Sequence, residues 1–164
     1  MLLGNSPHRS GWLVAVTIAA AGCLNILPLG WLGGYFQPDW MALVLIYWCI
    51  HEPDRVGVLT GWLSGLLLDL LGGGILGRHA LGKTVLAFAA NKVSLRFRAY
   101  PLWQQCLGVA VLVLLQTLVH ALVRLLLAEP PLPLALWLTP AASMIMWPLV
   151  VVVLSPRSRS RRYG

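Results

Sequence analysis

Charged residues are scarce in this sequence. Lys, Arg, Asp and Glu make up 10% of its 164 residues, whereas an ordinary soluble domain carries about 25%. So few charges cannot cover the surface of a soluble globule of this length, and 59% of the residues are hydrophobic. The composition therefore excludes a soluble protein and predicts a membrane protein whose surface faces lipid.

Acidic residues are the scarcer charged type, with five in the chain. An intramembrane aspartyl protease needs two deep acids, and Asp69 is the one acid well inside a predicted membrane segment. The pair His51-Glu52 lacks the second His of a zinc-binding H-E-x-x-H motif. Ser64 stands outside a G-x-S-G context, and His120 belongs to a different apolar segment. We therefore predict no catalytic site, no metal and no cofactor.

The three cysteines, Cys23, Cys49 and Cys106, lie far apart in apolar segments. They form no C-x-x-C pair, so the pattern predicts neither a disulfide framework nor a metal site. We expect buried free thiols, which behave as small apolar side chains.

Six apolar segments divide the chain, separated by charged, Pro-rich or Gly-rich stretches. A membrane-spanning helix needs about 20 apolar residues. The spacing predicts one all-α domain of about six transmembrane helices over residues 1–154 and a basic cytoplasmic tail over residues 155–164. The predicted helices cover residues 11–29, 39–51, 56–76, 79–97, 102–128 and 134–154.

The second segment is short for a membrane crossing. From Asp39 to Ile50 a helix would extend about 18 Å, against about 30 Å of hydrocarbon. Asp39 follows Pro38, and an Asp in this place favours a helix N-cap. The segment is therefore a short crossing helix, a half-helix, or a helix that begins earlier, near Tyr35.

Basic residues set the orientation, because Lys and Arg concentrate on the cytoplasmic side of membrane proteins. With six crossings and a cytoplasmic N-terminus, nine basic residues lie on the inner side and three on the outer side. Topology thereby explains the net charge of +7 without nucleic acid as a partner. We expect both termini in the cytoplasm, with the tail against anionic lipid. The outer three are Arg78, Lys83 and Arg124.

Residues 77–84 match the phosphate-binding pattern G-x-x-x-x-G-K-[ST] at every fixed position. A nucleotide-binding loop follows a buried strand and works with a downstream acid that helps to hold magnesium. After Asp69 the chain contains no Asp, and Glu129 is its one later acid. We therefore interpret the segment as an outer turn and a helix start, with no nucleotide bound and with Lys83 extending to the membrane interface.

Small residues form a stripe in the third predicted helix. Gly57, Gly61 and Gly65 recur every four residues, and Asp69 follows at the same interval. Positions four apart lie along one slanting face of a helix, where small side chains let another backbone approach closely. The stripe is either a packing face within this chain or a docking groove for a partner's membrane helix.

Asp69 is costly to bury as a charge, at about 2.5–3.5 kcal/mol on insertion scales. Its candidate partners are Asn25, Lys83, His120 and Arg124, which fall in the outer halves of their predicted helices. Asn25, His120 and Arg124 would then form an outer-side polar cluster. A structural salt bridge or a hydrogen-bonded cap competes with a role in proton or solute handling.

Two segments make the chain resemble the MreD family of Gram-negative bacteria. One is the sequence Pro-Asp-Trp at residues 38–40, and the other is the pattern G-x-x-x-G-W-x-x-G-x-x-x-D over residues 57–69. Residues 76–81 also resemble the family's continuation. The specific motifs thus cover residues 37–81, and the resemblance beyond them rests on hydropathy.

The resemblance implies a non-enzymatic subunit of the cell-elongation complex in the bacterial inner membrane. It also implies a bundle similar to the substrate-binding subunits of energy-coupling-factor transporters. The implied partners are MreC and, through it, MreB, RodA and the elongation transpeptidase, which together organise peptidoglycan synthesis and cell shape. The stripe over residues 57–69 would contact MreC or support that contact. The alternative is a small-molecule binding or transport subunit, since the similar vitamin-transporter component binds a ligand.

Overall fold

The fold is known from a computed structural model, which describes residues 7–26, 37–73 and 76–154. Within these residues the chain forms seven helices and no strand, which confirms the predicted all-α class. The predicted tail at 155–164, the end of the first predicted helix at 27–29 and Tyr35 lie outside the described residues. The helices are α1 (Pro7–Ile26), α2 (Trp40–His51), α3 (Val58–Gly72), α4 (Arg78–Ala99), α5 (Leu102–Leu126), α6 (Leu134–Trp137) and α7 (Thr139–Leu154).

α2 begins and ends where the sequence predicts. Asp39 is its N-cap, and its Oδ1 accepts a hydrogen bond from the amide of Ala42 at 2.9 Å. The helix has 12 residues and extends about 18 Å. Of the alternatives for this segment, the structure shows the short helix.

Several helix boundaries differ from the predicted ones, and two of the differences have a clear cause in the sequence. α3 ends at Gly72, before the predicted end at residue 76, because Gly73 takes the left-handed conformation (φ 63°) that terminates helices. The predicted helix over 134–154 is divided after Trp137 into α6 and α7. Pro140 explains this break, because it has no amide hydrogen to donate and its ring crowds the carbonyl four residues earlier.

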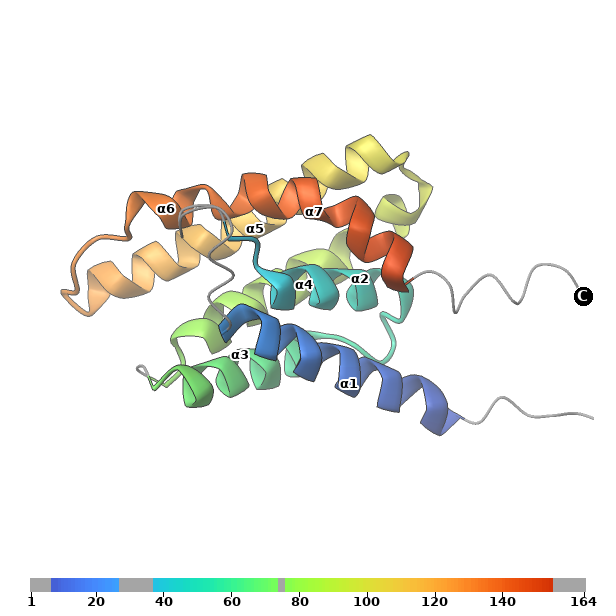
Figure 1. Cartoon of the computed structure of the whole chain (residues 1–164), viewed down its shortest axis with the longest axis horizontal. Coiled ribbons are helices and arrows are strands. Elements are labelled where there is room, and N and C mark those ends of the chain that lie inside the picture. The colour runs from blue at the N-terminus through green and yellow to red at the C-terminus, as the bar shows by residue number, and fades with distance from the viewer. Residues whose placement is uncertain (1–6, 27–36, 74–75, 155–164) are drawn as a thin grey trace, which may run out of the picture.

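The helices pack in three layers (Figure 1). α1 and α3 form one outer layer, α2 and α4 the middle layer, and α5 and α7 the other outer layer. α4 packs against α2, α3 and α5 and therefore contacts every layer. The start of α1 and the end of α7 lie at one end of the bundle, whereas α2 and α4 begin at the opposite end.

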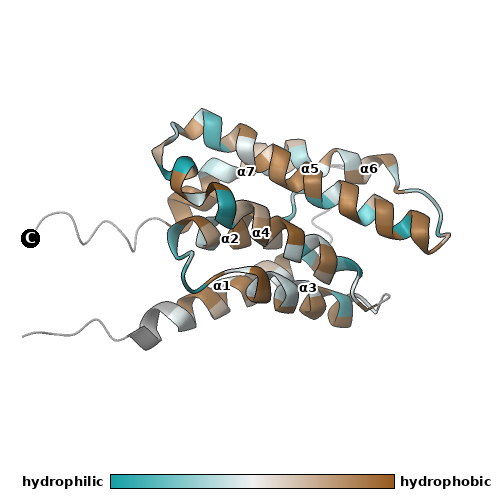
Figure 2. Cartoon of the chain, turned by 180° about the vertical axis from the view of Figure 1, so that it is seen from behind, coloured by the Kyte–Doolittle hydropathy of each residue, from teal (hydrophilic) through white to brown (hydrophobic). Residues whose placement is uncertain are grey.

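Several polar side chains are buried and many large apolar side chains are exposed, which is unlike a soluble protein. Lys83, Asp69 and Gln116 are buried, whereas Leu95 and Leu125 are at least 75% exposed. Apolar residues cover the outward faces of the helices, as Figure 2 shows. So large an exposed apolar surface is suited to lipid rather than to water.

Among the described residues, α5 is the one helix that is both long and apolar enough to cross a membrane by length and composition. Its 25 residues extend about 38 Å. α4 has 22 residues but carries five basic side chains. The six predicted crossings stay a prediction. Four further helices are apolar but have 10–17 residues: Gly11–Ile26, Trp40–His51, Val58–Gly72 and Thr139–Leu154.

Candidate functional site: a buried ion pair beside a polar cavity

Asp39 stands where five helices meet. Besides capping α2, its Oδ1 accepts a hydrogen bond from Nδ2 of Asn25, near the end of α1, at 3.0 Å. Its backbone amide donates to Oγ of Ser143 in α7 at 3.2 Å. Its Oδ2 accepts from Nζ of Lys83 in α4 at 2.5 Å and from Nε2 of Gln116 in α5 at 2.7 Å. One aspartate thus links α1, α4, α5 and α7 to the start of α2.

Lys83 is fully enclosed, with 0% of its surface exposed. Its ammonium donates to Asp39 and, at 3.2 Å, to Oε1 of Gln116. The amide of Gln116 therefore bonds both members of the ion pair. In an interior of low dielectric such a pair is stable only when complete, because removing one partner leaves an unpaired buried charge.

The predicted placement of Lys83 is therefore wrong. The sequence favoured a side chain that extends to the membrane interface, but the structure turns it inward to Asp39. The nucleotide-binding pattern over residues 77–84 places its essential lysine at the same position, and that lysine is committed to the ion pair. Gly77, with φ 100°, precedes α4, so this segment is the turn and helix start that we predicted.

Asp69 caps the start of α4 from the last turns of α3. Its carboxylate accepts hydrogen bonds from the backbone amides of Gly77, His79 and Ala80 at 2.8, 3.0 and 3.3 Å. Nδ1 of His79 lies 2.8 Å from Oδ1 of the same carboxylate. A helix N-terminus favours an anion, because its first amides have no partner within the helix and its dipole is positive there.

The predicted partners of Asp69 are wrong, whereas the alternative of a hydrogen-bonded cap is confirmed. Asn25 and Lys83 bond Asp39 instead. The bonds to Asp69 come mainly from backbone amides, which a search for oppositely charged side chains does not find.

The glycine stripe of α3 packs against α4. A Cβ atom at Gly61 would come within 2.6 Å of the carbonyl oxygen of Lys83, and one at Gly65 within 2.6 Å of the amide nitrogen of Ala80. A Cβ at Gly57 would lie 3.2 Å from Nδ2 of Asn91. The stripe is therefore a packing face within the chain, one of the two predicted alternatives, and α4 occupies the face that the other alternative assigned to a partner's helix.

The predicted outer-side cluster is brought together in part. Asn25 and His120 line one cavity, and the ring of His120 lies 5.1 Å from that of His79 in an edge-to-face arrangement. Arg124 is not among the lining residues. Its Nε donates to the carbonyl oxygen of Pro130 at 2.9 Å and lies 3.4 Å from Oε2 of Glu129.

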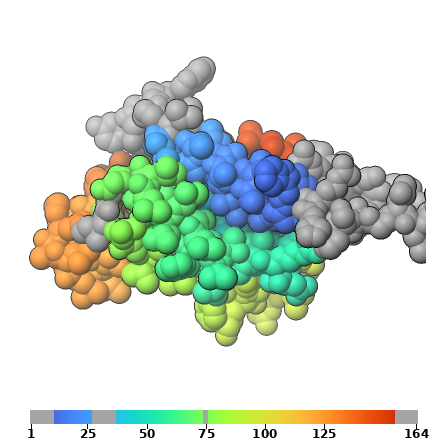
Figure 3. Space-filling model, turned by 90° about the horizontal axis from the view of Figure 1, so that it is seen from below, coloured from blue at the N-terminus to red at the C-terminus, as the bar shows by residue number. Residues whose placement is uncertain are grey.

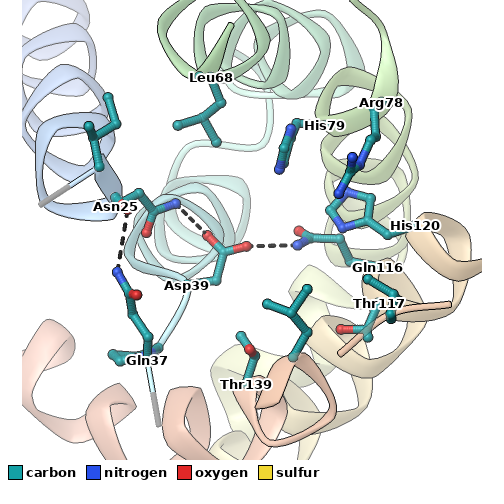
Figure 4. A pocket seen from close by; sticks show the side chains of 15 residues that line it. Asn25, Gln37, Asp39, Leu68, Arg78, His79, Gln116, Thr117, His120 and Thr139 are labelled. Atoms are coloured by element: carbon teal, nitrogen blue, oxygen red, sulfur yellow. Dashed lines mark hydrogen bonds between the residues drawn. The ribbon is translucent and has the colours of Figure 1, made fainter. Parts of the chain in front are cut away.

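The cavity has a volume of about 370 Å³ and lies at the end of the bundle where α2 and α4 begin. Figure 4 shows two polar groups on its wall: Asn25, Gln37 and Asp39 from α1 and the start of α2, and Arg78, His79 and His120 from α4 and α5. Apolar side chains complete the lining, among them Ile26, Leu68, Leu132 and Leu136.

Sequence reasoning missed Asp39 as the centre of this site. It recognised the residue as a helix N-cap but assigned the buried partnership to Asp69. A signal was present, since Lys83 falls within a predicted membrane segment and an ionisable residue there needs a partner. Ser143 and Gln116 gave no such signal, because an uncharged polar side chain does not require a counter-charge when it is buried.

The cysteines and the possible metal ligands can be located among the described residues. Cys49 is a buried free thiol as predicted, but Cys23 is exposed, because it points outward from α1. Within the described ranges, no three His, Cys, Asp or Glu side chains form a group that could hold a metal ion.

An apolar exterior and an interior linked by a buried ion pair define the class, a helical membrane protein. The family follows from comparison with known proteins. The model of the family described as rod shape-determining protein MreD matches residues 10–156. The rod shape-determining protein MreD of Haemophilus influenzae is 33% identical over 118 residues, which cover 72% of this chain and 73% of that protein. The chain therefore belongs to the MreD family and has a role in determining rod shape. No solved structure matches it.

Proposed function

We propose that this chain is a non-enzymatic, multi-pass subunit of the cell-elongation complex, which binds MreC within the bacterial inner membrane. Through MreC it connects to MreB, RodA and the elongation transpeptidase, and so helps to organise peptidoglycan synthesis. The proposal includes six crossings, both termini in the cytoplasm, and a fold related to the substrate-binding subunits of energy-coupling-factor transporters.

One observation carries this proposal beyond family membership. The network around Asp39 and Lys83 joins five helices through side chains that already bond one another. A buried polar network with its members satisfied rigidifies a structure. A rigid body with a lipid-facing surface is what an assembly subunit requires.

The groove between α1 and α3 is the contact face that we assign to the single membrane helix of MreC. Its volume is about 290 Å³, and its α1 wall presents Gly11, Ala15 and Ala19 at intervals of four residues. Figure 3 shows α1 and α3 side by side on one face of the molecule. Small side chains at this spacing let a second helix approach closely in a membrane.

The test is co-purification in mild detergent with MreC of the same bacterium, co-expressed with this chain. We expect a stable complex, which Ala15→Leu weakens by filling the groove. Ala141→Leu is the matched control, because Ala141 is an exposed alanine on α7, in a different layer. A well-folded chain that leaves MreC behind would refute the partner, and equal recovery of both variants would refute the face.

The membrane orientation has its own test. Fusions of a fluorescent protein that matures only in the cytoplasm, placed after residue 164, should be bright. A phosphatase that works only in the periplasm should be inactive at the same position. The opposite pattern would refute the proposed topology while leaving the MreC contact to be judged by co-purification.

A further inference from the structure

The cavity beside Asp39 has one wall whose hydrogen-bonding capacity is used up. Oδ1 of Asp39 accepts from Asn25 and Ala42, and Oδ2 accepts from Lys83 and Gln116. A carboxylate offers about four acceptor positions. Its charge is neutralised by Lys83, so this wall has little left for a cationic or donating ligand.

The opposite wall contains a donor without an acceptor. Nε of Arg78 and Nε2 of His120 are buried, and neither has a hydrogen-bond partner among the described residues. Figure 4 places Arg78, His79 and His120 together on this side of the cavity. Buried polar atoms in folded proteins are nearly always paired. Of these two nitrogens, Nε2 of His120 lies against Gly82, whereas Nε of Arg78 belongs to a guanidinium of the cavity lining and lacks an acceptor.

The charged groups near this wall also favour an anionic ligand. The guanidinium groups of Arg78 and Arg124 both turn to the carboxylate of Glu129, at 3.5 and 3.4 Å. Arg78 lines the cavity and shares the one carboxylate of Glu129 with Arg124, which lies outside the lining. The planar guanidinium matches phosphate oxygens, and such charge-assisted bonds are among the stronger hydrogen bonds in proteins.

The rest of the lining is apolar, which defines the remainder of the ligand. Ile26 and Leu136 are 48% and 40% exposed and lie beside the cavity, and Leu132 joins them on its wall. The cavity is at one end of the bundle, where α4 begins and α5 ends. In a membrane protein this end lies near the level of lipid headgroups.

We propose that this cavity binds the phosphate headgroup of a membrane lipid. Arg78 is the anchor for the phosphate oxygens, and the lipid chain follows the wall formed by Leu132 and Leu136. This inference goes beyond the assembly role and is independent of MreC, so either one can fail without the other.

The experiment is native mass spectrometry of the full chain, purified in detergent, delipidated, and exposed to defined lipids. Phosphatidylglycerol should remain bound, whereas diacylglycerol with the same chains, which lacks the phosphate, should not. Arg78→Gln should reduce the bound phosphatidylglycerol about tenfold, the effect of losing one charge-assisted hydrogen bond. Arg96→Gln is the control, because Arg96 is exposed near the other end of α4.

Two further variants make the result independent of the stability of Arg78→Gln. Leu136→Trp keeps every charge but fills the apolar wall, so it should also lose phosphatidylglycerol. Glu129→Gln releases Arg78 from its carboxylate and should increase retention.

Three results would overturn the proposal. They are equal retention of phosphatidylglycerol by wild type and Leu136→Trp, equal retention of diacylglycerol and phosphatidylglycerol, and displacement of the lipid by inorganic phosphate at equal concentration. The last result would assign the cavity to a soluble phosphate.

Discussion

The surroundings of Asp39 and Asp69 give the same kind of side chain two different kinds of partner. Asp69 bonds groups 8–11 residues away in the chain, mostly backbone amides at the start of the next helix. Asp39 bonds side chains 14, 44 and 77 residues away, on three other helices. The first arrangement closes a local turn between α3 and α4, whereas the second forms only when the whole bundle has assembled.

The two acids also differ in how their charge is balanced. Asp39 faces a full positive charge on Lys83, which has no exposed surface. Asp69 faces the partial charge of a helix N-terminus and the ring of His79, whose side chain is 40% exposed. Disturbing the region of Asp39 should therefore affect stability more than disturbing the region of Asp69, because the loss of Lys83 removes a full counter-charge, whereas Asp69 is balanced mainly by backbone amides.

The largest effect is expected at Lys83. Lys83→Met leaves the carboxylate of Asp39 buried without its counter-charge, which should lower the free energy of unfolding by about 3–5 kcal/mol. Unfolding in detergent, followed by circular dichroism, measures this change. Lys92→Met is the control, because Lys92 is an exposed lysine of the same helix.

The double variant Asp39→Asn/Lys83→Met sharpens the same result. It removes both charges, and most of the lost stability should return because a neutral pair is inexpensive to bury. If the losses in unfolding free energy of the two single variants add up in the double variant, Asp39 and Lys83 are not coupled. The proposed difference between Asp39 and Asp69 would then be refuted.

The next effect is expected where α3 meets α4, the contact that positions Asp69. Gly65→Ala places a methyl group against the backbone of α4, and backbone cannot move aside as a side chain end can. We expect a loss of about 3 kcal/mol, at the upper end for overpacking. Gly72→Ala, where nothing lies within 4 Å of the added atom, should be neutral or slightly stabilising. The melting temperatures of the two variants test this: Gly65→Ala should melt well below the wild type, and Gly72→Ala should not.

The smallest effect is expected at Asp69 itself. Asp69→Asn keeps one acceptor oxygen but turns an amide group toward backbone donors, at a cost of about 1–2 kcal/mol. Hydrogen exchange should show the change as faster exchange of the amides of Gly77 to Ala80, with the rest of the bundle unaffected. A global loss as large as that of Lys83→Met would mean that the α4 cap is not local.

Local features of this fold were predictable from the sequence. The N-cap at Asp39 and the turn before α4 follow from residues adjacent in the chain, and both are confirmed. The break between α6 and α7 was also predictable, because Pro140 interrupts a helix for the same reason as the prolines before residue 134. The predicted helix over 134–154 did not take Pro140 into account.

The pairing of Asp39 with Lys83 was not predictable in the same way. It depends on which faces of α2 and α4 meet, and α2 is apolar on every side, so its sequence has no hydrophobic periodicity that would identify its contact face. The same limit affected the glycine stripe, where spacing indicated close packing but could not indicate that α4 is the partner. Asp69 was misassigned for a third reason, since backbone amides leave no trace in the residue types.

The ion pair has a consequence for how this protein enters the membrane. In the proposed multi-pass arrangement, α2 is synthesised before α4, so Asp39 is in place when Lys83 leaves the ribosome. Insertion of a lone lysine in a membrane helix costs about 2.5–3.5 kcal/mol at the helix centre, and α4 bears four other basic residues. Under the proposed arrangement we expect α2 to lower the cost of inserting α4, because Asp39 supplies the counter-charge of Lys83.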